Sequence, residues 1–172
     1  AVYGGNSSGT LAGNDSIYLG AQTSLLTSTV YGGAGADTLV LGSATTGQLL
    51  NGTFKAFAGA DSINITGDLL TVTADAGTGN DTLYIAPKSN STGSVKTSLY
   101  GGAGTDKIEI ATGLNKGAIF ADTSSDDTAG GNDTITLVIS TAATVYGASG
   151  NDSVAATGAT SKASIYGGTG AD

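Results

Sequence analysis

The 172-residue sequence contains no cysteine, histidine, methionine or tryptophan, and Glu109 is its only glutamate. Enzymes that work through a nucleophile–base pair usually draw on cysteine or histidine, and zinc sites use the same residue types. We therefore predict that this chain is not an enzyme. The absence of cysteine also means that no disulfide marks the redox compartment of the protein.

Positive charge is scarce as well, because six lysines and no arginine stand against 14 acidic residues, for a net charge of −8. Nucleic acids and anionic membrane surfaces attract basic patches, so this balance argues against both as partners. No apolar run approaches the roughly 20 residues of a membrane-spanning helix. We expect neither nucleic-acid binding nor membrane insertion.

What the sequence has instead is a repeat of about 22 residues, each copy centred on an aspartate. Such self-similarity is typical of solenoids, in which each coil buries its apolar side only against its neighbours. The sequence starts at AVYGG and stops within a repeat, so we expect residues 1–172 to be a single β-solenoid domain or a segment of a longer repeat array. The anchors are Asp15, Asp37, Asp61, Asp81, Asp106, Asp133, Asp152 and Asp172, at intervals of 22, 24, 20, 25, 27, 19 and 20 residues.

An alternating pattern follows each anchor. Aliphatic residues stand two and four positions after the aspartate, as in Leu39 and Leu41, and the residue between them varies. This alternation predicts a short β-strand with one face inward, and parallel pairing of successive coils stacks the inward residues into columns. A slip of one residue would turn Asn64 or Glu109 into the core, so the register is well specified.

A second strand is predicted before each glycine turn. Val30-Tyr31, Leu99-Tyr100, Val145-Tyr146 and Ile165-Tyr166 precede their anchors by seven and six residues, and Phe54-Lys55 occupies the same slots in a degenerate copy. We expect the aliphatic member to point into the core and the aromatic member to form a partial ladder on the surface.

Each coil therefore reads as strand, variable connection, strand and glycine turn, with connections at 42–53 and 86–98 among others. Several connections carry one more apolar residue, which fits either a short third strand or a cap over the coil. A two-sided roll and a three-sided helix are both compatible with this pattern. The predicted fold is all-β: a parallel β-solenoid of about eight coils, with glycine–aspartate turns stacked along one edge. The extra apolar residues are Leu25, Leu49, Leu69 and Leu114.

The turns YGGAGAD (31–37), YGGAGTD (100–106) and YGGTGAD (166–172) resemble the GGxGxD nonapeptide of RTX, or haemolysin-type, calcium-binding repeats. DAGTGND (75–81) and YGASGND (146–152) are close relatives of the same motif. The resemblance implies a right-handed parallel β-roll that holds Ca²⁺ between the turns of successive coils. The ligands implied are Asp15, Gly33, Gly35, Asp37, Asp61, Gly77, Gly79, Asn80, Asp81, Gly102, Gly104, Asp106, Asp122, Asn132, Asp133, Gly150, Asn151, Asp152, Gly168, Gly170 and Asp172.

Elementary chemistry agrees with calcium at these turns. Ca²⁺ takes six to eight oxygen ligands, which a tight turn offers as backbone carbonyls and carboxylates. Glycine permits the positive φ angles that aim several carbonyls at one point. Equivalent aspartates on stacked coils lie about 4.8 Å apart, and at an effective dielectric constant near 20 each neighbouring pair repels by roughly 3.5 kcal/mol before screening. We therefore predict that folding depends on calcium; the alternative is a set of Asx-type turns that bind no metal.

Three departures from the RTX pattern matter. Motifs come about every 22 residues instead of every nine, so only one edge would carry calcium. Ala56 and Phe57 replace the paired glycines in KAFAGAD (55–61), which questions that site. Insertions precede Asp15 and Asp133. In addition, asparagines directly before several anchors either ligate the metal or favour the turn; they are Asn14, Asn80, Asn132 and Asn151.

Two functions fit these features. The first is a calcium-stabilised structural protein of a bacterial surface layer, sheath or extracellular filament, suggested by the Ala/Gly/Ser/Thr-rich composition and by similarity to repeats of such proteins. The second is the RTX region of a secreted adhesin or exoprotein that acts as a folding and secretion element and as a spacer. Both place the protein outside the cell or at its surface. The expected partners are copies of itself or further repeats of the same chain, together with cell-surface polysaccharide.

Overall fold

A computed structural model describes residues 2–4, 13–19, 28–42, 49–86, 96–114, 116–123, 130–139, 142–158 and 162–172. These residues form strands and turns and no helix, and therefore no helix that could cross a membrane. The strands are β1 (Val2–Tyr3), β2 (Ser16–Leu19), β3 (Ser28–Ala34), β4 (Thr38–Gly42), β5 (Leu49–Ala58), β6 (Ser62–Thr66), β7 (Asp68–Thr78), β8 (Thr82–Ala86), β9 (Lys96–Ala103), β10 (Lys107–Leu114), β11 (Gly117–Phe120), β12 (Thr134–Ile139), β13 (Ala143–Ser149), β14 (Ser153–Gly158) and β15 (Ser164–Thr169).

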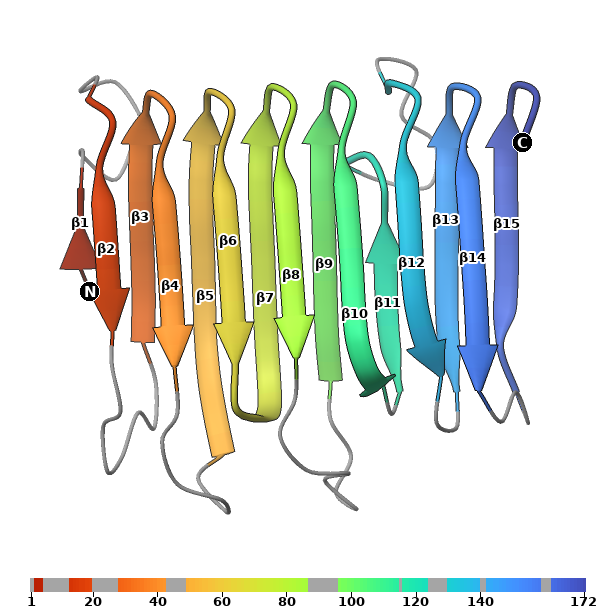
Figure 1. The fold of residues 1–172 in the computed structure, drawn as a ribbon, viewed down its shortest axis with the longest axis horizontal. Coiled ribbons are helices and arrows are strands. Elements are labelled where there is room, and N and C mark those ends of the chain that lie inside the picture. The colour runs from red at the N-terminus through yellow and green to blue at the C-terminus, as the bar shows by residue number, and fades with distance from the viewer. Residues whose placement is uncertain are drawn as a thin grey trace.

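The strands form two parallel sheets that run the length of the molecule. Odd-numbered strands make an eight-stranded sheet and even-numbered strands a seven-stranded sheet, each in chain order. The chain therefore climbs one strand, turns, descends the next and advances by one coil, as Figure 1 shows. The predicted all-β parallel solenoid is confirmed.

The two sheets decide between the alternatives left open by the sequence, because the described residues form a two-sided coil with no third sheet. Leu49 and Leu69 lie within β5 and β7, and Leu114 ends β10. Leu25 lies outside the described residues. The predicted connections at 42–53 and 86–98 were too long, because parallel pairing extends the strands: Leu49 already pairs with Asp68, and Lys96 with Thr71.

The core lies between the two sheets. The inward positions predicted from the alternation are buried in the central coils and pack into one continuous cluster, while Ile17, Leu19, Val154 and Ala156 are partly buried against it. Equivalent residues pair across every coil, for example Ile63 with Leu83 and Leu83 with Ile108. Aliphatic columns of this kind specify the register, because a one-residue slip would expose every one of them.

Aromatic residues form the predicted ladder on the outer face of the odd-numbered sheet. Tyr100, Phe120, Tyr146 and Tyr166 stack with ring centroids 5.0, 4.9 and 5.1 Å apart and interplanar angles of 4°, 3° and 10°. Towards the N-terminus the same slots hold Lys55 and Asp75, which form an ion pair at 3.2 Å. The ladder is therefore continuous only over the C-terminal coils.

Candidate calcium-binding edge

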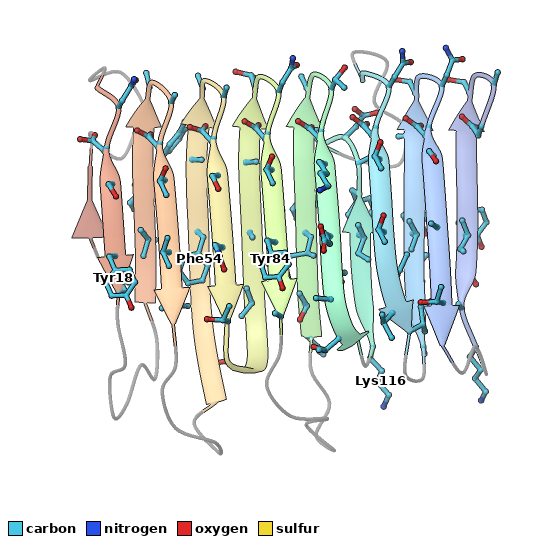
Figure 2. The ribbon with its side chains drawn as sticks, in the orientation of Figure 1. Tyr18, Phe54, Tyr84 and Lys116 are labelled. Atoms are coloured by element: carbon cyan, nitrogen blue, oxygen red, sulfur yellow. The ribbon has the colours of Figure 1, made fainter. Side chains whose placement is uncertain are left out.

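The glycine–aspartate turns line up along one edge, where odd-numbered strands end and even-numbered strands begin (Figure 2). The predicted need for positive φ is met at the glycines assigned to the site. Their φ angles run from 106° to 147°, at Gly33, Gly35, Gly77, Gly79, Gly102, Gly104, Gly150, Gly168 and Gly170. A side chain at Gly104 would strike the carbonyl of Gly79 on the preceding coil. Glycine is thus required both for the turn and for the close stacking of turns.

The anchor aspartates form a hydrogen-bonded ladder through their side chains. Each anchor except the last donates its backbone N–H to the Oδ1 atom of the next anchor, at 2.6 to 3.1 Å. The six anchors from Asp37 to Asp152 are buried, with 1–4% of their surface exposed, whereas Asp15 is half-buried and Asp172 exposed. One carboxylate oxygen of each anchor from Asp37 to Asp172 is therefore used within the fold.

The second carboxylate oxygen has no such use. Oδ2 is buried and lacks a hydrogen-bond partner at six consecutive anchors, Asp37, Asp61, Asp81, Asp106, Asp133 and Asp152. At Asp106 it lies 2.6 Å from the place where a Cβ on Gly101 would stand, and the carbonyl oxygen of Ala121 on the next coil borders the same place. The buried Oδ2 thus has no donor to satisfy it, an arrangement that a cation relieves, whereas the carbonyl of Ala121 accepts the backbone N–H of Gly102 at 2.9 Å.

The pKa values of these carboxyls report the same environment. Burial raises the pKa of Asp106 to about 7; the backbone hydrogen bond from Asp81 opposes the shift, and the neighbouring carboxylates add to it. Burial likewise raises the pKa of Asp133 to about 7 and that of Asp61 to about 6. The pKa values of Asp37, Asp81 and Asp152 also rise through burial. Without a metal, burial therefore makes these carboxyls easier to protonate than an ordinary aspartate.

The donor set fits calcium, with main-chain atoms as an essential part. Among the described residues no three Asp, Glu, His or Cys side chains gather closely enough to hold a metal ion by themselves. Carboxylate Oδ2 atoms and turn carbonyls are hard oxygen ligands, the type that Ca²⁺ prefers over the nitrogen and sulfur ligands of zinc. The anchor aspartates would hold the ion together with the glycine-turn carbonyls, and the ion would neutralise the stacked negative charge.

The turn that the sequence brought into question keeps the common geometry. Phe57 adopts a φ of 84°, in the region normally left to glycine, and Ala148 does the same at 74° in its own turn. Asp61 accepts from the backbone of Asp37 at 2.6 Å and has the same unpartnered Oδ2 as the other central anchors. The repeat register thus imposes the turn even where the glycine is missing, at the cost of backbone strain.

The asparagines before the anchors link neighbouring turns. Asn80 Oδ1 accepts the backbone N–H of Thr105 at 3.0 Å, and Asn132 accepts that of Asn151 at 2.7 Å. Asn14 and Asn151 make the same contact to the following coil. These bonds run in the opposite direction to the aspartate ladder, because each aspartate accepts from the preceding coil. The asparagines therefore stabilise turn stacking.

Asp122 lies beside the column, in the insertion before Asp133. It is fully buried, and its Oδ2 accepts the backbone N–H of Ser149 at 3.0 Å. It also contributes to the raised pKa values of Asp106 and Asp133. The structure thus brings this sequence-predicted residue to the edge. The other inserted aspartates, Asp126 and Asp127, and most of the insertion before Asp15 lie outside the described residues.

Sequence reasoning missed the first glycine of each pair. A Cβ at Gly147 would lie 2.6 Å from Asp152 Oδ2, and side chains at Gly32, Gly101 and Gly167 would likewise meet the carboxylates of their own turns. These glycines make room for the buried carboxylate instead of providing a positive φ. The signal was present in the doubled glycine of the motif, of which only the second member was assigned to the site.

The fold and its aspartate column define a parallel β-solenoid built from glycine–aspartate repeats. The family model of the RTX calcium-binding nonapeptide repeat (4 copies) matches residues 28–44, which include β3, the turn ending at Asp37 and β4. Residues 28–44 thus match a repeat motif that binds calcium, which supports Ca²⁺ as the ion for this edge. No match was found among curated proteins or among solved structures.

Proposed function

We propose that the protein is a calcium-stabilised extracellular structural protein, part of a bacterial cell-surface layer, sheath or filament. The observation that carries this proposal is the column of six buried carboxylate oxygens without a protein partner. Such a column opposes folding in the absence of a cation. Extracellular calcium modules bind at roughly 10⁻⁴ to 10⁻³ M, so a fold that needs calcium at this level forms outside the cell.

The rest of the molecule supports a structural role. Calcium at every turn would fasten each coil to the next along one edge, while the aliphatic columns fasten them through the core. Repeat stacks of this kind are extended and gain stability from each added coil. The natural partners are therefore copies of the chain or further repeats of the same protein, which extend the same two sheets.

The second candidate is a folding and secretion element of an adhesin or exoprotein, which also serves as a spacer. The same carboxylate column favours it, because a chain that stays unfolded without calcium suits passage through an export channel. The two candidates differ in assembly alone, since both require calcium-dependent folding.

Sedimentation velocity and negative-stain electron microscopy, with calcium and after EDTA treatment, separate the two. The structural role predicts ordered fibres or sheets in calcium that dissolve on EDTA treatment. A folded protein that remains monomeric in calcium at all concentrations tested contradicts the structural role and favours the spacer.

A further inference from the structure

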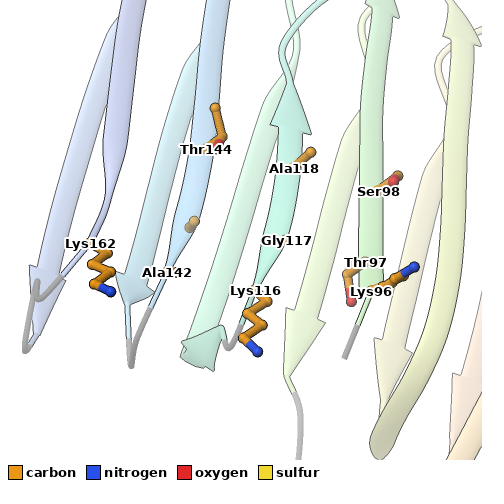
Figure 3. Close-up of a pocket in the computed structure, with 10 residues that line it drawn as sticks. Lys96, Thr97, Ser98, Lys116, Gly117, Ala118, Ala142, Thr144 and Lys162 are labelled. Carbon is orange, nitrogen blue, oxygen red and sulfur yellow. The ribbon is translucent and has the colours of Figure 1, made fainter. Parts of the chain in front are cut away.

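The outer face of the odd-numbered sheet carries a second charged feature, far from the calcium edge. Lys96, Lys116 and Lys162 border a hollow of about 360 Å³, together with small residues of β9, β11 and β13 (Figure 3). Figure 2 places Lys116 at the edge opposite the glycine–aspartate turns. Strand β9 runs from Lys96 to Ala103 at the turn end, a length of about 23 Å at roughly 3.3 Å per residue. This distance exceeds the screening length of roughly 8 Å, so the aspartate column does not neutralise these lysines.

The three lysines lie near the same end of neighbouring odd-numbered strands, and we call them the lysine row. Ser98 pairs with Ala118, Ala118 with Thr144, and Thr144 with Ser164. Two positions earlier in the sequence stand Lys96, which begins β9, and Lys116, Ala142 and Lys162, which lie just ahead of β11, β13 and β15. Three of four consecutive coils therefore carry a lysine at or just before the start of their odd-numbered strand, although like charges on neighbouring coils repel. On the preceding coil the equivalent position is Thr71, so the row belongs to the C-terminal coils.

These lysines lack the partners that the other described lysines have. Lys55 pairs with Asp75 at 3.2 Å and Lys107 with Glu109 at 3.3 Å. Across the described part of the chain, no acidic group lies within ion-pair distance of the three lysines in the row, in a protein whose net charge is −8. The hollow thus carries positive charge that no acidic group of the described residues neutralises.

The hollow is an open groove across β9, β11 and β13, lined by the three lysines and by small residues. Ser98, Ala118 and Thr144 lie on its floor, and the aromatic ladder stands two positions further along the strands, outside the lining of the groove. The floor residues and the aromatic rings share the outward face, because residues two apart on a strand lie on the same side; the three lysine side chains are exposed. A ligand that follows the lysine row is linear, carries negative charges spaced one or two coils apart, and offers hydroxyls to the floor.

We propose that this groove binds a linear acidic polysaccharide, with its carboxylates or sulfates on Lys96, Lys116 and Lys162. Single-stranded nucleic acid fits less well, because base binding relies on open ring faces and the rings here cover one another at about 5 Å. The site is independent of polymer formation. It requires only that the coils be folded, and it would attach the calcium-loaded solenoid to a charged glycan.

Fluorescence anisotropy with a labelled hyaluronan oligosaccharide tests the carboxylate source, and labelled dextran sulfate tests the sulfate source. Both are measured on calcium-loaded protein whose far-UV spectrum shows that it is folded. Neutral dextran and oligothymidylate of matched length serve as controls. The test variant combines Lys96→Gln, Lys116→Gln and Lys162→Gln. The matched control combines Lys55→Gln and Lys107→Gln with Ala155→Glu, at an exposed site on the even-numbered sheet, which changes the net charge equally.

We expect saturable binding of at least one acidic glycan, weakened about tenfold by the test variant and less than about twofold by the control, since three charge contacts are lost only in the former. Added salt should reduce the binding. Absence of binding to both glycans by folded protein overturns the proposal, as does equal loss in the two triple variants. Tighter binding of oligothymidylate than of either glycan reassigns the groove to nucleic acid and also overturns it.

Discussion

Replacing the central anchor Asp106 by asparagine should have opposite effects with and without calcium. The Oδ1 atom of Asn remains available to accept the backbone N–H of Asp81, which lies 2.7 Å away in the native protein. The amide nitrogen takes the place of the unpartnered Oδ2 and supplies a donor beside the carbonyl of Ala121. The hydrogen-bonded ladder therefore persists, while the negative charge and one metal ligand are lost.

The magnitude follows from the spacing of the column. Neighbouring carboxylates about 4.8 Å apart repel by roughly 3.5 kcal/mol per pair at an effective dielectric constant of 20, and Asp106 has a neighbour on each side. Screening and side-chain relaxation reduce this, so we expect Asp106→Asn to stabilise the metal-free fold at pH 8 by about 1 to 3 kcal/mol. In saturating calcium the variant should be less stable than the native protein and should bind fewer ions.

The assay is far-UV circular dichroism in EDTA during titration with trimethylamine N-oxide, which favours the folded state and so measures stability even where the native protein is unfolded. Isothermal titration calorimetry counts the calcium ions bound. Glu109→Gln, on the solvent face of β10, is the control for a simple change in net charge. If Asp106→Asn destabilises the protein equally in EDTA and in calcium, the carboxylate serves packing and the electrostatic reasoning is wrong.

Three further predictions concern pH, the turns and the core. Burial raises the folded-state pKa values of Asp61, Asp106 and Asp133 from an ordinary 3.8 to about 6 to 7. Between pH 3.8 and about 7, the metal-free folded protein therefore binds more protons than the unfolded chain. Its stability should be greatest near pH 4 and fall as pH rises through 7; an EDTA-treated sample with a higher melting temperature at pH 8 than at pH 5 contradicts this. Gly102→Ala should destabilise the calcium-loaded protein by at least about 2 kcal/mol, because φ is 107° and the carbonyl of Gly77 blocks a Cβ. Ala148→Gly, at a residue whose φ is 74°, should be neutral or stabilise the protein by up to about 1 kcal/mol. Urea titrations of the two variants compare these effects, and equal effects refute the reasoning. Ile108→Ala, at a fully buried site, should lower the free energy of unfolding by about 2 to 5 kcal/mol. This loss should exceed that of Val154→Ala, where the side chain is only partly buried. Urea unfolding measures both, and similar losses at the two sites argue against a continuous core.

Much of the fold could be predicted because the same pattern of aliphatic residues recurs in every coil. The in-phase aliphatic residues, such as Ile63 and Leu83, set strand direction, register and core at once, and the structure confirms them. What escaped prediction depends on neighbours in space. Strand β9 begins at Lys96 because Thr71 on another coil pairs with it, which no local pattern announces.

The site shows the same division. The aspartates and the positive-φ glycines could be predicted from the motif. Which carboxylate oxygen accepts a hydrogen bond from the neighbouring coil could not. Oδ1 of Asp81 is occupied by the backbone of Asp61, and only the stacked coils reveal that Oδ2 remains without a partner. The tolerance of Phe57 at a glycine position is likewise a property of the stack, since neighbouring coils hold the turn in place.

The most direct test of the account is a calcium titration of EDTA-treated protein at neutral pH, followed by far-UV circular dichroism, with magnesium as the control ion. The account predicts that β-structure appears with calcium over a narrow concentration range and that magnesium, which demands stricter octahedral geometry, does not replace it. A full β-sheet spectrum in EDTA, unchanged by added calcium, would contradict the claim that the aspartate column needs a cation to fold.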